Sequence, residues 1–258
     1  MISYPEISPE IVRIGPFAVR WYGMMYLAGF ASSYFLVGYQ IKKKGLNLSR
    51  DFVSSLYTYL ILGLIIGARI GYVIFYDLLS YIRNPLEIVA LWHGGMSFHG
   101  GMIGCIVSGV IFSKKHNIDF WQFSDFIIVT APIGLGLGRI GNFINAELYG
   151  RVTDLPWAMV FPGGGPLPRH PSQLYEFFLE GVVLFILLWM LKDRGFRTGI
   201  LTALFLVLYG LFRFLVEFVR EPDVQLGFVI GSFTMGQLLS AAMMLAGVSI
   251  FYIRKNSG

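Results

Sequence analysis

The sequence of 258 residues is poor in cysteine and in charge. Its single cysteine, Cys105, excludes an intramolecular disulfide and a metal cluster held by several cysteines. Asp, Glu, Lys and Arg make up only 14% of the chain, whereas soluble domains carry about 25%. The motifs H-x-x-x-H and H-E-x-x-H do not occur, so we expect no metal. The scarcity of charge argues against a water-soluble globular enzyme.

Apolar residues take the place of the missing charge. They form 55% of the chain, and the mean hydropathy is +0.66. Because a helix needs about 20 such residues to cross a bilayer, we predict an all-α polytopic membrane protein with about seven transmembrane helices. All of residues 1–258 are expected to form a single integral membrane domain. The expected spans are Phe17–Gln40, Phe52–Tyr76, Gly94–Ser113, Phe120–Arg139, Ser172–Leu191, Gly199–Val219 and Phe228–Ile253.

Basic residues are divided unevenly among the segments that join these spans. Segments rich in Lys and Arg face the cytoplasm by the positive-inside rule. One alternate set holds eleven of them: Lys42, Lys43, Lys44, Arg50, Lys114, Lys115, Lys192, Arg194, Arg197, Arg254 and Lys255. The other set holds five: Arg13, Arg83, Arg151, Arg169 and Arg220. We therefore predict an outer N-terminus and a cytoplasmic C-terminus. We interpret the net charge of +5 as a result of this orientation and not as a sign of nucleic-acid binding.

Ionisable residues inside the expected spans gather toward the outer face. Such side chains are costly in a bilayer and are functional candidates by default. Asp125, near the inner end of the fourth span, is the exception and is interpreted as an interfacial or helix-starting charge. The outer group consists of Arg69, His99, Arg139, Glu176, Glu180, Arg213 and Glu217.

Four polar residues share one face of the sixth span. Tyr209, Arg213, Glu217 and Arg220 follow one another at helical spacing. One interpretation is an internal salt bridge between Arg213 and Glu217. The other is an anion receptor, in which Arg213 and Arg139 exceed the acids near them and bind a phosphate.

Glycine patterns predict close helix packing. Gly136–Gly141 matches G-x-G-x-x-G but ends a membrane span, so we expect close helix approach or an irregular backbone rather than a nucleotide site. Gly63, Gly67 and Gly71 recur every four residues and predict a packing stripe. A bent or re-entrant backbone beside His99 is expected from its neighbours Gly94, Gly95, Gly100, Gly101 and Gly104.

The segment Gly138–Gly150 is too polar to face lipid. We expect it to line a wet or protein-walled cavity, although a plain outer loop remains the alternative. His99 carries an imidazole that accepts or donates protons near neutral pH, but a structural histidine is the competing interpretation. The polar residues of the segment are Arg139, Asn142, Asn145 and Glu147.

Four motifs, in this order, carry a family resemblance: H-G-G at His99–Gly101, the stretch Gly138–Gly150, the run Leu167–Glu176 and the run Tyr209–Pro222. Together they resemble the phosphatidylglycerol–prolipoprotein diacylglyceryl transferases. The resemblance covers essentially the whole chain. Arg20 stands where some members have histidine, and the outer segment between Arg151 and Arg169 is shorter than in some.

The resemblance implies a bacterial inner-membrane enzyme whose active site faces the periplasm. Such an enzyme moves the diacylglyceryl group of phosphatidylglycerol to the lipobox cysteine thiol of a prolipoprotein, forms a thioether and releases glycerol phosphate. Its partners would be phosphatidylglycerol, prolipoprotein signal peptides and membrane lipids, and no cofactor is required. The nucleophile belongs to the substrate, so Cys105 need not take part.

The resemblance also implies which residues form the site. Catalytic roles fall to His99, Arg139 and Arg213, with His99 as the candidate base for the thiol and the arginines stabilising the leaving phosphate. Asp125 is implied to be functional without a stated role. Substrate binding is implied for Arg139, Arg213, Tyr22, Asn142, Glu147, Gly150, Tyr209, Glu217 and Arg220.

Three other classes of protein were weighed. A transporter or channel for anions also uses embedded arginines, but it needs polar groups along a route to both faces. An intramembrane protease is disfavoured, because Ser97 and His99 are too close on a helix to face each other and G-x-S-x-G is absent. A purely structural membrane protein leaves the embedded charges unexplained.

Overall fold

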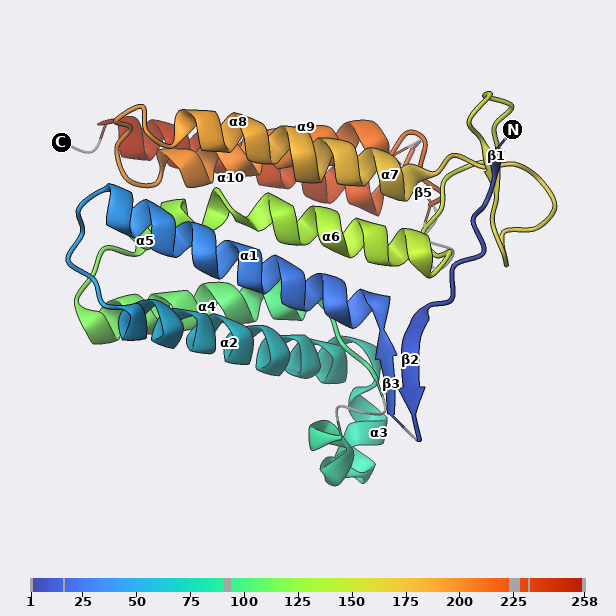
Figure 1. The fold of residues 1–258 in the computed structure, drawn as a ribbon, viewed down its shortest axis with the longest axis horizontal. Coiled ribbons are helices and arrows are strands. Elements are labelled where there is room, and N and C mark those ends of the chain that lie inside the picture. Colours follow the sequence, from blue (N-terminus) through green and yellow to red (C-terminus); the bar gives the residue numbers. More distant parts are fainter. Residues whose placement is uncertain (1, 16, 91–93, 223–227, 232, 257–258) are drawn as a thin grey trace. The chain divides into compact units, whose positions relative to one another are not determined.

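The computed structural model describes residues 2–15, 17–90, 94–222, 228–231 and 233–256, most of them in helices (Figure 1). The chain divides into two compact units. The first unit consists of Met1–Leu36 with Asp125–Gly258, and the second unit is Val37–Ser124. That the whole chain forms one integral membrane domain stays a prediction.

The first unit holds most of the elements. It contains β1 (Ile2–Ser3), β2 (Glu10–Ile14), β3 (Phe17–Arg20), the start of α1 (Trp21–Lys43), the end of α5 (Phe120–Ile128), α6 (Ala131–Ile144), β4 (Met159–Val160), α7 (Ser172–Glu176), η3 (Phe177–Val183), α8 (Leu184–Leu191), α9 (Ile200–Val216), β5 (Phe228–Ile230), β6 (Phe233–Thr234) and α10 (Met235–Asn256). The second unit contains the rest of α1, α2 (Arg50–Tyr76), α3 (Leu78–Arg83), η1 (Pro85–Val89), α4 (Phe98–His116) and the start of α5.

Short strands replace the ends of two predicted spans. β2 and β3 pair antiparallel with Val12 opposite Val19, so the first helix begins at Trp21 and not at Phe17 as predicted. β5 and β6 likewise pair antiparallel, and α10 begins only at Met235. A third sheet joins β1 and β4 in parallel. The predicted boundaries were wrong here because apolar residues that pair as strands cannot be told from helix ends by hydropathy.

The predicted fourth span is bent rather than continuous. α5 and α6 meet at an angle of 43°. Pro132 lies in the first turn of α6, where its missing N–H leaves no helical hydrogen bond unmade. At the bend, Thr130 donates its hydroxyl to the carbonyl of Ile127 (2.8 Å), and its side chain lies 2.6 Å from the Ser33 hydroxyl.

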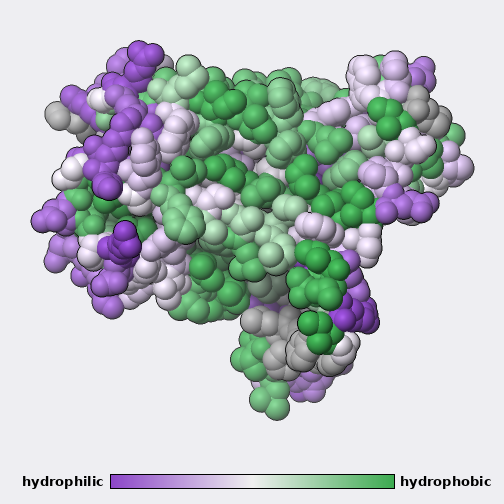
Figure 2. Space-filling model, viewed as in Figure 1, coloured by the Kyte–Doolittle hydropathy of each residue, from purple (hydrophilic) through white to green (hydrophobic). Residues whose placement is uncertain are grey.

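By length and composition, the described residues contain three helices able to cross a membrane. They are α2, the continuous helix formed by α7, η3 and α8, and α10. The bent pair α5–α6 would make a fourth, and α9 is a shorter apolar helix. Figure 2 shows hydrophobic side chains along the helices and hydrophilic residues beyond their ends. The chain therefore has the character of a multi-pass membrane protein.

In the second unit, α2 and α4 pack through glycines, as the spacing predicted. A Cβ on Gly71 would lie 2.7 Å from the Cα of Gly100, and one on Gly67 would lie 2.7 Å from the Cα of Gly104. Gly100, Gly101 and Gly104 are thus part of a regular helix, so the expectation of a bent backbone around them was wrong. Of the five glycines beside His99, only Gly94 and Gly95, before α4, have positive φ angles.

In the first unit, glycines bring α6 close to its neighbours. A Cβ on Gly181 of η3 would lie 2.8 Å from the Cα of Gly136, and one on Gly29 of α1 would lie 2.8 Å from the Cα of Gly134. Of the G-x-G-x-x-G match, Gly136 is therefore explained by helix packing, whereas a Cβ on Gly138 would meet nothing within 4 Å. α8, α9 and α10 run side by side (Figure 1), with an apolar core of Val129, Leu184, Leu188, Leu201 and Phe205.

Candidate active site

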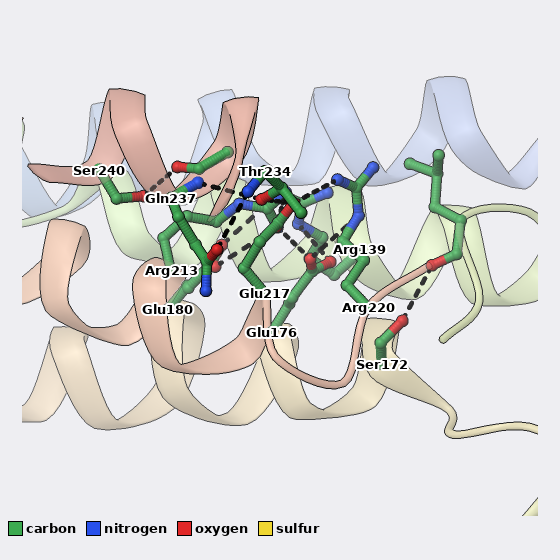
Figure 3. A network of polar contacts seen from close by, with 12 residues as sticks. Arg139, Ser172, Glu176, Glu180, Arg213, Glu217, Arg220, Thr234, Gln237 and Ser240 are labelled. Carbon is green, nitrogen blue, oxygen red and sulfur yellow. Dashed lines mark hydrogen bonds and ion pairs between the residues drawn. The ribbon is translucent and has the colours of Figure 1, made fainter. Parts of the chain in front are cut away.

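Three helical segments of the first unit bring charged side chains together (Figure 3). Arg139 comes from α6 and Arg213 from α9. Glu176 ends α7 and Glu180 lies in η3, a π-helical stretch of the same continuous helix. π-Helical turns inside α-helices are frequent at functional sites because the extra residue re-aims the side chains around it. The site therefore lies where α6, α7–η3 and α9 meet.

Arg139 and Arg213 meet on the same carboxylate. Arg139 Nε lies 3.1 Å from Oε2 of Glu176, and Arg213 Nη1 donates to Oε1 of Glu176. Glu180 is further from both arginines: its Oε2 lies 3.5 Å from Arg139 Nη2 and its Oε1 lies 3.9 Å from Arg213 Nη1. Two helices distant in sequence are thereby joined through one buried acid.

A second carboxylate, Glu217, continues the network along α9. Its Oε2 lies 3.0 Å from Arg213 Nη2, which is the salt bridge expected from their spacing. Oε1 accepts a hydrogen bond from the Thr234 hydroxyl (3.0 Å) and lies 3.6 Å from Arg220 Nη1. A Cβ on Gly236 would lie 2.5 Å from the Glu217 carboxylate, so this glycine leaves room for the acid in its present position.

The expected excess of arginine over acid is wrong. Three guanidiniums, Arg139, Arg213 and Arg220, face three carboxylates, Glu176, Glu180 and Glu217. Glu176 and Glu180 reach the cluster from another helix. A count of the acidic residues along α9 alone therefore does not include them. Their side chains are 0% exposed, whereas Arg139 is 20% and Arg213 13% exposed. The acids are therefore fully buried and hold the arginines, whose side chains are partly exposed.

The polar segment after Arg139 is an ordered turn at the end of α6. Asn142 donates through Nδ2 to Oε1 of Glu147 (2.7 Å), and Asn145 donates to the same oxygen at 3.3 Å. Gln173 Nε2 donates to the backbone carbonyl of Glu147 (2.6 Å). This last bond ties the turn to α7, next to Glu176, so two of the sequence-predicted residues lie beside the arginine cluster.

Gly150 and Arg220 lie where two chain segments touch. The two residues form an antiparallel bridge, and the N–H of Gly150 donates to the carbonyl of His170 (2.8 Å). A Cβ on Gly150 would collide with the Val219 carbonyl and lie 2.7 Å from the Cβ of His170. Burial lowers the pKa of His170, so this imidazole is neutral at pH 7. Gly150 thus permits a close backbone approach.

The two predicted tyrosines lie on different sides of α6. Tyr209, one turn before Arg213, stacks on Phe205 with ring centres 5.5 Å apart. Tyr22 lies in the first turn of α1, and its hydroxyl lies 3.1 Å from that of Tyr26. A Cβ on Gly141 would be 2.7 Å from the Tyr22 ring, so this glycine makes room for the ring against α6.

Comparison with known proteins identifies the family of the chain. The family model described as prolipoprotein diacylglyceryl transferase matches residues 9–253. The chain belongs to this family. A phosphatidylglycerol–prolipoprotein diacylglyceryl transferase of Desulfotalea psychrophila is 54% identical over 98% of this chain and 95% of its own length. Proteins of the same name from Pseudomonas paraeruginosa and Geobacter sulfurreducens are 50% and 51% identical, over 97% and 96% of this chain and 94% and 96% of theirs.

The diacylglyceryl transferase family resemblance had also pointed to His99 and Asp125. His99 is an exposed residue in the first turn of α4, in the second unit, where Ser97 caps the helix by accepting from the N–H of Gly100 (3.2 Å). Asp125 lies in α5, but it caps the start of α9 rather than the start of its own helix. Its carboxylate accepts from the N–H of Gly199 (2.7 Å) and from the N–H and hydroxyl of Thr202 (2.8 and 2.7 Å).

Two members of the cluster, Glu176 and Glu180, were not among the predicted site residues. Both had been noted as embedded acids, and their spacing of four places them on one helical face. That spacing was the available signal. Their partners could not be deduced from it, because Arg139 and Arg213 are 37 residues away from Glu176 in opposite directions along the chain.

Proposed function

We propose that this chain transfers the diacylglyceryl group of phosphatidylglycerol to the lipobox cysteine thiol of prolipoproteins. The sulfur forms a bond to the glyceryl carbon, and the bond between that carbon and the phosphate oxygen breaks. A thioether and glycerol phosphate result. The names of relatives about half identical over nearly the full length support this reaction.

The observation that carries the proposal is the meeting of Arg139 and Arg213 on Glu176. A guanidinium has five N–H donors, of which the buried acids behind it use only some. We expect the remaining donors of both arginines, whose side chains are partly exposed, to bind a phosphodiester. As the carbon–oxygen bond breaks, negative charge grows on the phosphate, and two fixed cations in a low-dielectric site stabilise it.

The nucleophile in this proposal is the thiol of the substrate, which attacks as the thiolate. A free thiol has a pKa of about 8.5, so a base near the incoming cysteine increases the reactive fraction. We assign that role to His99, whose exposed position at the start of α4 leaves it accessible. Tyr22, Asn142, Glu147, Gly150, Tyr209, Glu217 and Arg220 are assigned to substrate binding.

We further propose seven membrane spans in the bacterial inner membrane, with the N-terminus and the site toward the periplasm and the C-terminus in the cytoplasm. Each unit by itself supports this polarity. In the first unit, Arg254 Nε donates to the Thr198 carbonyl (2.8 Å), which places the basic end of α10 at the start of α9, away from Arg213. In the second unit, Lys115 lies at the opposite end of α4 from His99.

A transfer assay tests the reaction. The purified protein is mixed with phosphatidylglycerol labelled in its acyl chains and with a lipobox peptide, and the peptide is followed by gel shift. We expect label on the peptide that has its cysteine and none on a matched peptide with serine in that place. Label on neither peptide, with the protein folded, would reject the transferase.

Removing either arginine is the sharpest test of the phosphate-binding role. Arg139→Ala and Arg213→Ala should each lower the transfer rate about a hundredfold, because loss of one charge-stabilising contact costs on the order of 3 kcal/mol in the transition state. Arg194→Ala, an exposed arginine beyond α8, is the control and should keep the rate. Wild-type turnover of purified Arg139→Ala would remove this residue from the mechanism.

The proposed base predicts a dependence on pH. His99→Gln should suppress transfer near pH 7 and recover part of the rate at alkaline pH, where the substrate thiol ionises without help. The measurement is the transfer rate from pH 6 to about 9.5, a range that brackets the thiol pKa. Equal loss at every pH would assign His99 a structural role.

A further inference from the structure

Glu180 is a buried acid that the proposed mechanism does not use. Its side chain is 0% exposed, and among the described residues neither of its oxygens accepts a hydrogen bond of normal geometry. The nearest cations, Arg139 Nη2 and Arg213 Nη1, are 3.5 and 3.9 Å away. A buried carboxylate with such loose contacts is costly to keep ionised.

The other two acids of the cluster are held more tightly. Glu176 Oε1 accepts from Arg213, and its Oε2 lies 3.1 Å from Arg139 Nε. Glu217 Oε1 accepts from Thr234 at 3.0 Å, and its Oε2 lies 3.0 Å from Arg213. Glu180 is therefore the acid of the cluster whose charge is least stabilised by contacts (Figure 3).

The balance of charge within the cluster suggests a role for Glu180. With every group ionised, three guanidiniums and three carboxylates cancel, so a lipid phosphate would enter a neutral, buried cluster and add an uncompensated negative charge. A proton on one carboxyl restores the balance, because the cluster then carries one positive charge. Arg139 of α6, Tyr209 and Arg213 of α9, and Glu176 of α7 all face Glu180, and a neutral Glu180 also relieves its repulsion with Glu176.

We propose that Glu180 takes up a proton when the anionic phosphodiester of the lipid headgroup binds to Arg139 and Arg213. The proton converts a carboxylate that competes for the arginines into a neutral carboxyl, which releases donors of both guanidiniums to the phosphate. Glu180 acts here as a positioning residue for the arginines, not as a group that touches the reacting carbon. The proposal rests on the phosphate-binding role described under Proposed function.

Lipid binding without peptide isolates the effect, because no transfer takes place. The purified, full-length protein in detergent is titrated with dioctanoyl-phosphatidylglycerol by calorimetry, in two buffers of different ionisation enthalpy at the same pH. The difference in heat gives the protons taken up, and we expect about one per lipid bound. By linkage, affinity should fall as pH rises, by up to about tenfold per pH unit. No net proton uptake by the wild type would overturn the proposal.

Glu180→Gln imitates the protonated acid and should bind the lipid without proton uptake. Its affinity should be independent of pH and, at alkaline pH, at least as tight as that of the wild type. Asp51→Asn, which removes an exposed acid outside the cluster, is the control and should keep the proton uptake. A Glu180→Gln protein that is folded by size exclusion but keeps the wild-type proton uptake or pH slope would overturn the proposal.

The two proposals fail in different ways. If the wild type transfers no label to the peptide and does not bind the lipid, the proposed function fails. If it transfers label and binds lipid through Arg139 and Arg213, but with proton uptake unchanged in Glu180→Gln, only the role of Glu180 fails.

Discussion

Arg69 in the second unit and Arg139 in the first are both arginines within predicted spans, yet their surroundings differ. Arg69 is 3% exposed and donates to backbone carbonyls. Its Nε donates to Ile88 (2.9 Å), and its two terminal nitrogens donate to the carbonyls of Glu87, Ala90, Gly94 and Gly95. Arg139 is 20% exposed and faces carboxylates.

The difference separates a scaffold arginine from a site arginine. Arg69 donates its N–H groups to backbone carbonyls between α3 and α4, and it thereby fixes the segment that leads to His99. Arg139 is held by Glu176 and Glu180, and its side chain is partly exposed. Position within the membrane alone marks both residues as functional. What distinguishes them is whether the guanidinium is satisfied by backbone or by buried acids.

Replacing Arg69 should have the largest effect on stability. Arg69→Met keeps an apolar stem but leaves several buried carbonyls without a donor, which should cost on the order of 3 kcal/mol or more of unfolding free energy. Thermal unfolding in detergent measures it. Arg139→Ala should lose activity even in the protein that remains folded, whereas Arg69→Met should lose activity only in proportion to its loss of folded protein. If Arg69→Met unfolds like the wild type, the distinction between the two arginines is broken.

Much of the site was predictable because it follows a local period. The helical spacing of α9 places Tyr209, Arg213 and Glu217 on one face, and the structure has them there, with the expected pair between Arg213 and Glu217. The glycine stripe of α2 was predictable for the same reason, since a spacing of four lines one side of a helix.

Contacts between distant segments were not predictable. The pairing of Glu176 with both arginines depends on how α6, α7 and α9 pack, which no local spacing contains. The cap that Asp125 provides to α9 joins residues more than 70 positions apart. Hydropathy also missed the bend between α5 and α6, because the apolar character of the sequence continues through it. The type of a residue can mark it as a candidate for the site, but the residue that it pairs with can be identified only once the fold is known.

The contact between α2 and α4 in the second unit should be sensitive to added volume. Gly104→Ala on α4 would bring a Cβ into the Gly63 carbonyl and to 2.9 Å from the Cα of Gly67, forcing α2 and α4 apart. Overpacking of this kind costs about 1–3 kcal/mol. The matched control is Gly109→Ala in the same helix, whose Cβ would meet only Phe120 at 3.5 Å. This change should be neutral or stabilise by about 0.5–1 kcal/mol, because alanine favours a helix.

Thermal unfolding of the two glycine variants side by side checks the contrast. Equal melting of Gly104→Ala and Gly109→Ala would mean that the close approach of α2 and α4 does not stabilise the second unit. Transfer activity should follow the folded fraction in both, because neither glycine is assigned to substrate.

Substitution of Asp125 tests whether the first unit also contains polar residues that only stabilise the fold. Gly199, the N-cap of α9, has no side chain, so the Asp125 carboxylate takes the place of the cap residue. Its charge also lies at the positive end of the helix dipole. Asp125→Asn keeps the shape but removes the charge and one acceptor oxygen, and should cost about 1 kcal/mol.

Thr202→Val refines this last prediction, because it removes only the hydroxyl donor and leaves both backbone N–H groups bonded to Asp125. It should destabilise less than Asp125→Asn, which affects every contact at the start of α9. If Asp125 acts through the helix, both variants should change the rate of transfer in proportion to their loss of stability and leave the KM for lipid unchanged. A large loss of rate in a fully folded Asp125→Asn protein would instead place Asp125 with Arg139 and Arg213 in the chemistry, and the first unit would hold a second functional centre at the opposite end of α9.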